Sequence, residues 1–113
     1  MPYQVFYTSY SLQQSVSSSS PRLLDGDQLK ALILNILKEE DDFLGVIDNE
    51  DRVIQFMRSA ADNFLVEIPS FDAKNSLQRH LSTEETLELI ARLPTSLRDL
   101  DLSPFNLVAW AER

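Results

Sequence analysis

Phe43-Leu44-Gly45-Val46-Ile47 begins the stretch of sequence that decides the fold, residues 43–81. This first segment is nearly all apolar, and the polar residues 48–51 that follow it favour a turn. Further β-prone segments lie at residues 53–58, 63–68 and 76–81. The connections between the segments have four to seven residues, which is typical of antiparallel hairpins. The stretch therefore predicts four antiparallel strands, and the third should end at Pro69 because proline donates no hydrogen bond to a sheet.

A helix is predicted on each side of this stretch. Residues 27–40 carry apolar side chains at the spacing of one buried helix face: Leu29, Leu32, Ile33, Ile36 and Leu37. Asp25 or Asp27 can act as the N-cap of this helix by accepting its first backbone N–H groups. After the strands, Ser82 and Glu85 have the spacing of a capping box, and the helix that they begin should stop at Pro94.

The two ends of the chain complete the predicted fold. Residues 3–10 are aromatic and β-prone and predict a further strand, whereas residues 13–21 are rich in Ser and predict a flexible loop. Residues 97–102 favour a helical turn, and residues 105–110 a last strand or a packed tail. We expect an α+β fold in a single domain spanning residues 1–113. It should contain a single antiparallel sheet of about four to six strands, with two main helices packed on one face.

Composition narrows the classes of function. The 113 residues include no cysteine and one histidine, which excludes thiol chemistry and argues against sites that need several histidines. The net charge of −8 disfavours direct binding to nucleic acid, which needs clustered Lys and Arg. No apolar run approaches the ~20 residues of a membrane span, and the N-terminus has no basic leader. We therefore expect a cytoplasmic protein that contacts no membrane.

Motifs for metal binding and catalysis fail when they are tested residue by residue. A calcium-binding loop that begins at Asp48 would need an acidic residue and a glycine where the chain has Arg52 and Val53. His80 lacks a nucleophile to activate, since Ser82 already serves as a helix cap. The two glycines of the chain are too few for a phosphate-binding loop. We expect no metal, no cofactor and no enzymatic activity.

One face of the predicted sheet is a candidate interface. If the aromatic side chains of the strands point toward the helices, the alternate positions form an outer face of mixed polarity: Val53, Gln55, Met57, Leu65, Glu67 and, on the fourth strand, Arg79. Met and Arg are enriched where proteins bind one another. The outer face therefore suits a protein partner, although a solvated sheet face with scattered apolar residues has the same pattern.

Acidic residues are concentrated in one quarter of the chain. Residues 25–51 contain nine of the eighteen acidic residues and only two lysines. Seven of the nine are candidate binding residues, in two sets that need not touch because residues 43–47 would span ~17 Å as a strand: Glu39, Glu40, Asp41 and Asp42, and then Asp48, Glu50 and Asp51. The first four crowd the predicted C-terminus of the first helix, where negative charge opposes the helix dipole. These acidic residues would accelerate association with a basic partner, and a purely solubilising role is the alternative.

Residues 43–93 contain a series of short segments in a fixed order. Phe43-Leu44-Gly45-Val46-Ile47 is followed by Val53-Ile54-Gln55-Phe56, by Phe64-Leu65-Val66-Glu67-Ile68 and by the helix start Ser82-Thr83-Glu84-Glu85. This series resembles the immunity proteins of bacterial polymorphic toxin systems. The chain departs from them at Ile68-Pro69, where such sequences often have a basic tail, and in its Ser-rich loop. The resemblance implies a protein that blocks a cognate toxin, often a nuclease or another toxic enzyme, by binding it tightly.

Two functions from different classes follow from the sequence. The first is a non-catalytic immunity protein that neutralises a basic toxin domain by occluding it. The second is a structural or regulatory subunit that self-associates as a homodimer through the open face of the sheet. A toxin gene next to the gene for this chain would favour the first, and a stable homodimer without such a neighbour would favour the second.

Overall fold

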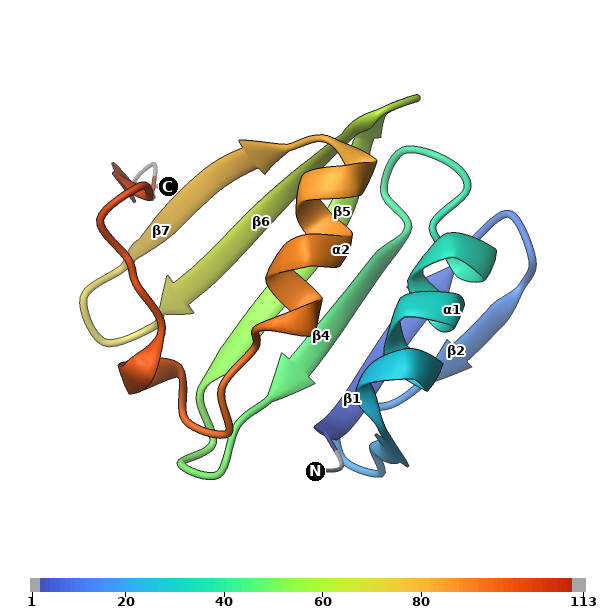
Figure 1. Cartoon of the computed structure of the whole chain (residues 1–113), viewed down its shortest axis with the longest axis horizontal. Coiled ribbons are helices and arrows are strands. Elements are labelled where there is room, and N and C mark those ends of the chain that lie inside the picture. The colour runs from blue at the N-terminus through green and yellow to red at the C-terminus, as the bar shows by residue number, and fades with distance from the viewer. Residues whose placement is uncertain (1–2, 111–113) are drawn as a thin grey trace.

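The computed structural model describes residues 3–110, in which two helices interrupt a series of strands (Figure 1). The elements are β1 (Tyr3–Ser9), β2 (Gln14–Val16), β3 (Arg22–Leu24), α1 (Gly26–Ile36), β4 (Phe43–Ile47), β5 (Val53–Ala60), β6 (Asn63–Ser70), β7 (Asn75–Leu81), α2 (Thr83–Ala91), the 3-10 turn η1 (Leu97–Asp99) and β8 (Asn106–Ala109).

The strands of the described residues form one antiparallel sheet in the order β2-β1-β4-β5-β6-β7-β8, with β3 also paired to β1. The α+β class is confirmed, but the expected number of four to six strands is wrong because the sheet has eight. The additional strands are short. β2 and β3 have three residues each, too few to show an alternating pattern in the sequence, and within the sheet both pair only with β1.

Two local predictions at strand ends need correction. Residues 14–16 lie within the predicted Ser-rich loop but form β2, in which Val16 pairs with Tyr7. Pro69 does not end the third hairpin strand, because β6 continues to Ser70 and Pro69 pairs with Ser76 of β7. The ladder between β5 and β6 ends at Gln55 and Glu67, so Pro69 lies where only β7 flanks it. A missing N–H costs less at such a position than between two strands.

Helix α1 is shorter than its apolar pattern predicts. Its capping box at Asp25 and Gln28 is complete, but the helix ends at Ile36, so Glu39 and the acidic residues after it lie in the following loop. The C-terminus of the helix, the negative end of its dipole, has a positively charged neighbour. The guanidinium Nε of Arg58, from β5, donates to the carbonyl oxygen of Leu37 at this end. The predicted helix end at residue 40 is therefore wrong, and the four acids follow the helix instead of forming its last turn.

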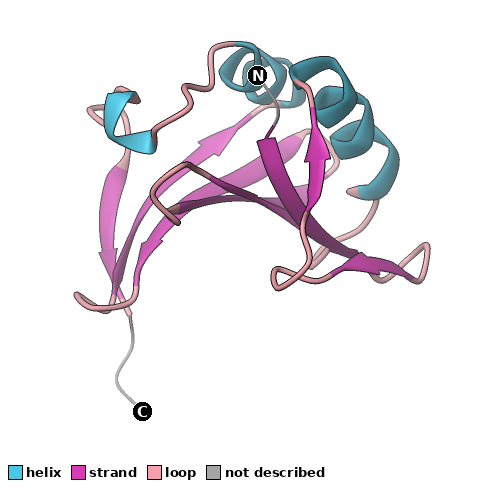
Figure 2. Cartoon of the chain, turned by 90° about the horizontal axis from the view of Figure 1, so that it is seen from below, coloured by secondary structure: helices cyan, strands magenta, loops and turns pink. Residues whose placement is uncertain are grey.

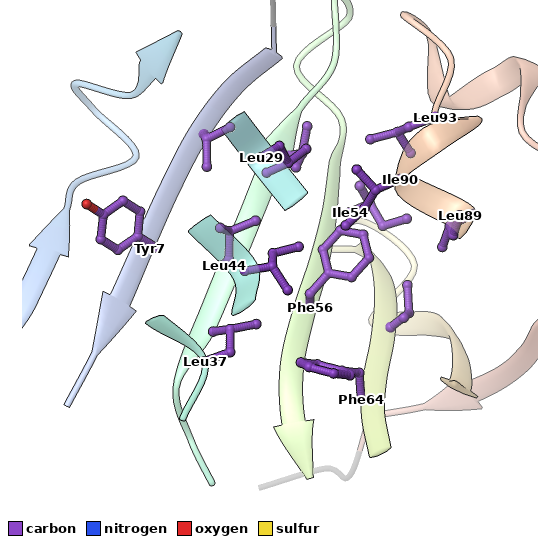
Figure 3. Close-up of a cluster of buried hydrophobic side chains, with 14 of the residues drawn as sticks. Tyr7, Leu29, Leu37, Leu44, Ile54, Phe56, Phe64, Leu89, Ile90 and Leu93 are labelled. Atoms are coloured by element: carbon purple, nitrogen blue, oxygen red, sulfur yellow. The ribbon is translucent and has the colours of Figure 1, made fainter. Parts of the chain in front are cut away.

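Both helices cover the same face of the sheet, and the core lies between them and the strands. Figure 2 shows the sheet as an arch whose ends bend away from the helices, with the opposite face open. Alternate strand residues fill the core beneath the helices, as in Figure 3, and include Val5, Leu44, Ile54, Phe56, Phe64 and Val66. The parity predicted for β5 and β6 is thus confirmed. On α1, Leu29 and Ile33 are fully buried, whereas Leu32 is only partly buried against the core.

Candidate interface on the open sheet face

The strand register arranges the open side of the sheet in cross-strand rows. Antiparallel partners point their side chains to the same face. One row, termed here the apolar row, consists of Thr8, Phe43, Met57, Leu65 and His80. The next, termed the central row, consists of Phe6, Gly45, Gln55, Glu67, Gln78 and Asn106. Ile47, Val53 and Pro69 also lie on this outer face, and Gln55, Met57 and Glu67 lie on it as predicted.

The centre of the outer face is only half exposed. Phe43, Met57 and Leu65 are partly buried, as are Gln55 and Glu67 in the neighbouring row. The side-chain amide of Gln78 donates to Oε2 of Glu67 over 2.8 Å. At the other end of the central row the ring of Phe6 covers Gly45, where a Cβ atom would lie 2.1 Å from the ring. The face is therefore a packed surface of fixed shape.

An exposed acidic loop borders this face. Glu39, Glu40 and Asp41 lie in the loop between α1 and β4, and all three are exposed. Glu40 and Asp41 line a hollow of about 450 Å³ together with Tyr10, Phe43 and Met57. Two candidate regions that are separate in the sequence, the acidic loop and the outer face, therefore share one margin. Phe6, Tyr10 and Phe43 were not among the predicted site residues, although the alternation within residues 3–10 carries the signal for Phe6.

Asp42 differs from its acidic neighbours because it is fully buried. Its Oδ1 accepts the backbone N–H of Tyr10 at 2.8 Å, and its Oδ2 accepts the N–H groups of Lys38 and Glu39, each at 3.1 Å. The hydroxyl of Ser11 donates to the same Oδ2 at 3.0 Å. Burial alone raises the pKa of Asp42, but these hydrogen bonds outweigh burial and hold the pKa below its usual value. Asp42 therefore holds the loop in place and is not available to a partner.

The second set of predicted acidic residues is at the far end of β4, and most of it stabilises the local fold. Asp48 is buried, with Oδ1 accepting the N–H groups of Glu50 and Arg52 and Oδ2 accepting that of Leu97. Glu50 forms ion pairs with Arg52 at 3.4 Å and with Arg98 at 2.8 Å. Of this group only Asp51, at the tip of the turn, is fully exposed without such contacts in the described part of the chain. The seven acids are thus not one binding cluster.

Arg79 lies on the wrong side of the sheet for the predicted interface. It pairs with Val66, whose side chain is buried beneath the helices, so Arg79 belongs to the helix-covered face. There it lines a hollow of about 340 Å³ next to Asp99, Asp101 and Arg92. Its expected position was wrong because the parity of β7 cannot be read from Leu77, Arg79 and Leu81 without knowing their register with β6.

The two rows of the outer face contain one acidic residue and no lysine or arginine. Among residues 3–110, Glu67 is the only acidic residue on the outer face. The only basic side chain in the two rows is that of His80, whose Nδ1 lies 2.9 Å from Oδ1 of Asn63. With Glu40 and Asp41 at the margin, the whole surface presents negative charge. It is therefore electrostatically complementary to a basic surface.

Other features that would indicate a chemical site are missing from the part of the chain that the structure describes. Within residues 3–110 no group of three or more His, Asp or Glu side chains is placed to hold a metal ion. Over the same residues, neither helix has the length and apolar character needed to cross a membrane. No protein-family model, curated protein or solved structure matches this chain.

Proposed function

We propose that this chain is a non-catalytic binding protein that holds a basic protein partner against its outer face. In the form suggested by the resemblance of residues 43–93, it is an immunity protein that neutralises a bacterial toxin by occluding it. One observation carries the proposal: the partly buried apolar row and the exposed acidic loop adjoin at one margin of the outer face. Protein interfaces combine these two parts: a core rich in aromatic residues and Met, and a polar rim.

The charges of the rim give this proposal its direction. Glu39, Glu40 and Asp41 are exposed at one edge of the face, where they act on an approaching partner through solvent. Such rim charges raise the rate of encounter with a surface of opposite sign. Basic surfaces are typical of nucleases, because their substrates are polyanions. A nuclease toxin would therefore match the surface by charge.

Self-association through the same face is the alternative, and the position of Glu67 argues against it. In a two-fold dimer each surface patch meets its own copy. Glu67 lies near the middle of the face, between Gln55 and Gln78, so stacking of two copies would bury both Glu67 carboxylates in one desolvated layer with no lysine or arginine in the rows of either copy. Like charges that are buried together are costly. The acidic loops would add further repulsion.

Affinity capture from the native host tests the proposal. The bait proteins are the wild type, Leu65→Lys in the apolar row and the control Leu34→Lys. Leu34 is exposed on α1, on the opposite side of the sheet, and receives the same chemical change. We expect one basic protein to be retained stoichiometrically by wild type and by the control, and lost from Leu65→Lys. A partner that Leu65→Lys still retains would show that the outer face is not the interface.

Two further measurements separate the immunity function from its alternatives. The captured partner is expressed from an inducible promoter together with wild type or with Leu65→Lys, and growth is followed. We expect growth arrest that only the wild type relieves; a harmless partner would mean that the protein binds but is not an immunity protein. Self-association is tested by measuring the molar mass in solution by light scattering. A wild-type dimer that Leu65→Lys converts to a monomer would establish self-association through this face.

A further inference from the structure

We propose that Glu67 is the anchor point of the outer face and receives one arginine side chain of the partner. This inference rests on the proposed function and identifies the chemistry that the partner must bring. The inference is based on the position of Glu67, an ionisable side chain among apolar and amide groups in the interior of the face, away from the acidic margin.

The surroundings of Glu67 leave its charge without a cation. Along β6 its neighbours on the same face are Leu65 and Pro69, and across the strands they are Gln55 and Gln78. The amide of Gln78 supplies one hydrogen bond, to Oε2. The ion pairs found among residues 3–110 join Glu50 to Arg52 and to Arg98, and none includes Glu67. Glu67 is only partly buried, so its carboxylate is still accessible to solvent.

Covering the face changes this balance. A partner that excludes water from Leu65 and Met57 also removes water from the Glu67 carboxylate in the neighbouring row, and a buried charge is costly unless it is paired and hydrogen-bonded. Gln55 and Gln78 contribute dipoles but no positive charge. A tight partner must therefore bring a cationic donor to this point of the face.

The geometry favours arginine over lysine for this role. A guanidinium group can donate two parallel hydrogen bonds to a carboxylate, whereas an ammonium group acts as a point charge. The aliphatic stem of an arginine can also lie on the apolar row, where Met57 and Leu65 are partly exposed. Glu67 thus differs from Glu40 and Asp41, which are exposed at the margin and act on the approach of the partner. Loss of Glu67 should act on the lifetime of the complex.

A short arginine peptide tests the inference directly by NMR. The probe is acetyl-Leu-Arg-Leu-amide, and its control carries citrulline, which has nearly the shape of arginine without the charge. Both are titrated into isotope-labelled protein at neutral pH and low salt. We expect the Glu67 carboxyl carbon and the side-chain amides of Gln55 and Gln78 to shift with the arginine peptide alone. Equal shifts with citrulline, or shifts confined to the loop of Glu40 and Asp41, would overturn the inference.

A matched pair of variants completes the test. Glu67→Gln removes the charge at nearly constant shape, and Glu88→Gln makes the same change at an exposed site on α2, beyond the helix-covered face. We expect Glu67→Gln to raise the dissociation constant of the peptide at least about tenfold and Glu88→Gln to leave it unchanged. Equal effects of the two variants would contradict the anchor role. The comparison of arginine with citrulline on the wild type does not depend on whether either variant folds.

Binding of the captured partner to the three variants distinguishes this inference from the proposed function. If Leu65→Lys loses the captured protein while Glu67→Gln binds it as tightly as Glu88→Gln does, the outer face is the interface and the anchor is wrong. If Leu65→Lys and Glu67→Gln both retain it, the proposed function fails and the anchor role fails with it. If both lose it and Glu88→Gln does not, both conclusions hold.

Discussion

Asp41 and Asp42 are adjacent in the chain but have opposite surroundings. Asp41 is exposed with a positive φ of 75°, next to the hollow below Tyr10. Asp42 is buried, and its two oxygens accept three backbone N–H groups and the hydroxyls of Ser9 and Ser11. The sequence shows two equal charges, whereas the structure assigns one to the surface and the other to the fold. A single peptide unit therefore separates a candidate binding residue from a structural one.

Replacing Asp42 by Asn should destabilise the protein by about 2–3 kcal/mol. An amide has one acceptor oxygen, so its NH₂ group must face at least one of the N–H donors of Tyr10, Lys38 and Glu39, and a buried donor is then left unpaired. Urea denaturation at pH 7 measures the difference. Asp41→Asn, the exposed neighbour, is the matched control and should change the stability by less than about 0.5 kcal/mol.

The pH dependence of stability should change with Asp42 as well. Hydrogen bonds hold its pKa in the folded state below the ordinary value of 3.8, so its contribution is present above about pH 4 and is lost as the pH falls through the folded-state pKa. We expect the free energy of unfolding of Asp42→Asn to fall less steeply between about pH 5 and pH 2 than that of the wild type. Parallel slopes in that interval would show that Asp42 gains no such stabilisation.

Gly45 depends on the ring of Phe6. A Cβ atom at Gly45 would meet Cζ of that ring at 2.1 Å, so Gly45→Ala must displace the ring and should cost about 1–3 kcal/mol. In a Phe6→Ala background the same change should cost nothing, because the space is then empty. A double-mutant cycle by thermal or urea unfolding measures this coupling. Additive effects of the two changes would mean that the ring does not cover Gly45 in solution.

At the scale of elements, periodicity predicted the long segments and failed for the short ones. The capping box of Ser82 and Glu85 and the alternation of Ile54 with Phe56 follow from local spacing, and both are found as expected. The three-residue strands β2 and β3 depend on pairing with β1, which no local pattern encodes. The side of the sheet taken by Arg79 depends on register for the same reason. Of the site, the outer-face residues of β5 and β6 could be predicted, but their contact with the acidic loop could not.

On α1, the residues that are buried differ from those that the apolar pattern predicts. Leu32 stands at the centre of the apolar pattern, but it is only partly buried, whereas Leu29 is fully buried. We expect Leu29→Ala to cost about 2–5 kcal/mol, as should truncation of the buried Phe64 on β6. Leu32→Ala should cost only about 1 kcal/mol, since full burial of such a side chain contributes about 1.5–3 kcal/mol. Denaturant midpoints rank the three, and an equal loss at Leu32 and Leu29 would contradict this order.

At the scale of the whole molecule, the acidic residues serve two different purposes. Asp42, Asp48 and Glu50 are committed to hydrogen bonds and ion pairs of the fold. Glu39, Glu40 and Asp41 are exposed in the loop before β4, so their charges can act at long range. Long-range action is screened by salt, with a Debye length of about 10 Å at 0.1 M ionic strength. This difference in role makes the charge of the loop separable from the stability of the fold.

Neutralising the loop should slow association and spare the fold. We expect Glu39→Gln, Glu40→Gln and Asp41→Asn together to lower the association rate with the basic partner about tenfold or more at low salt, with a smaller change in dissociation. The wild-type rate should fall toward that of the variant as salt rises. Stopped-flow or biosensor kinetics measure both rates. An association rate that the triple variant leaves unchanged at low salt would mean that the loop only contributes solubility.

The order of the strands has a consequence for how the chain reaches this structure. From β4 to β7 every strand pairs with its neighbour in sequence, whereas β1 pairs with β4 only across the whole of α1. Local pairings close short loops and form early, and distant ones wait for them. We expect native-state hydrogen exchange to show the slowest amides in β5 and β6, faster exchange in β1, and the fastest in β2, β3 and β8. A kinetic nucleus in the meander of β4 to β7 would leave β1 and its two short companions to dock last, onto a sheet that is already formed.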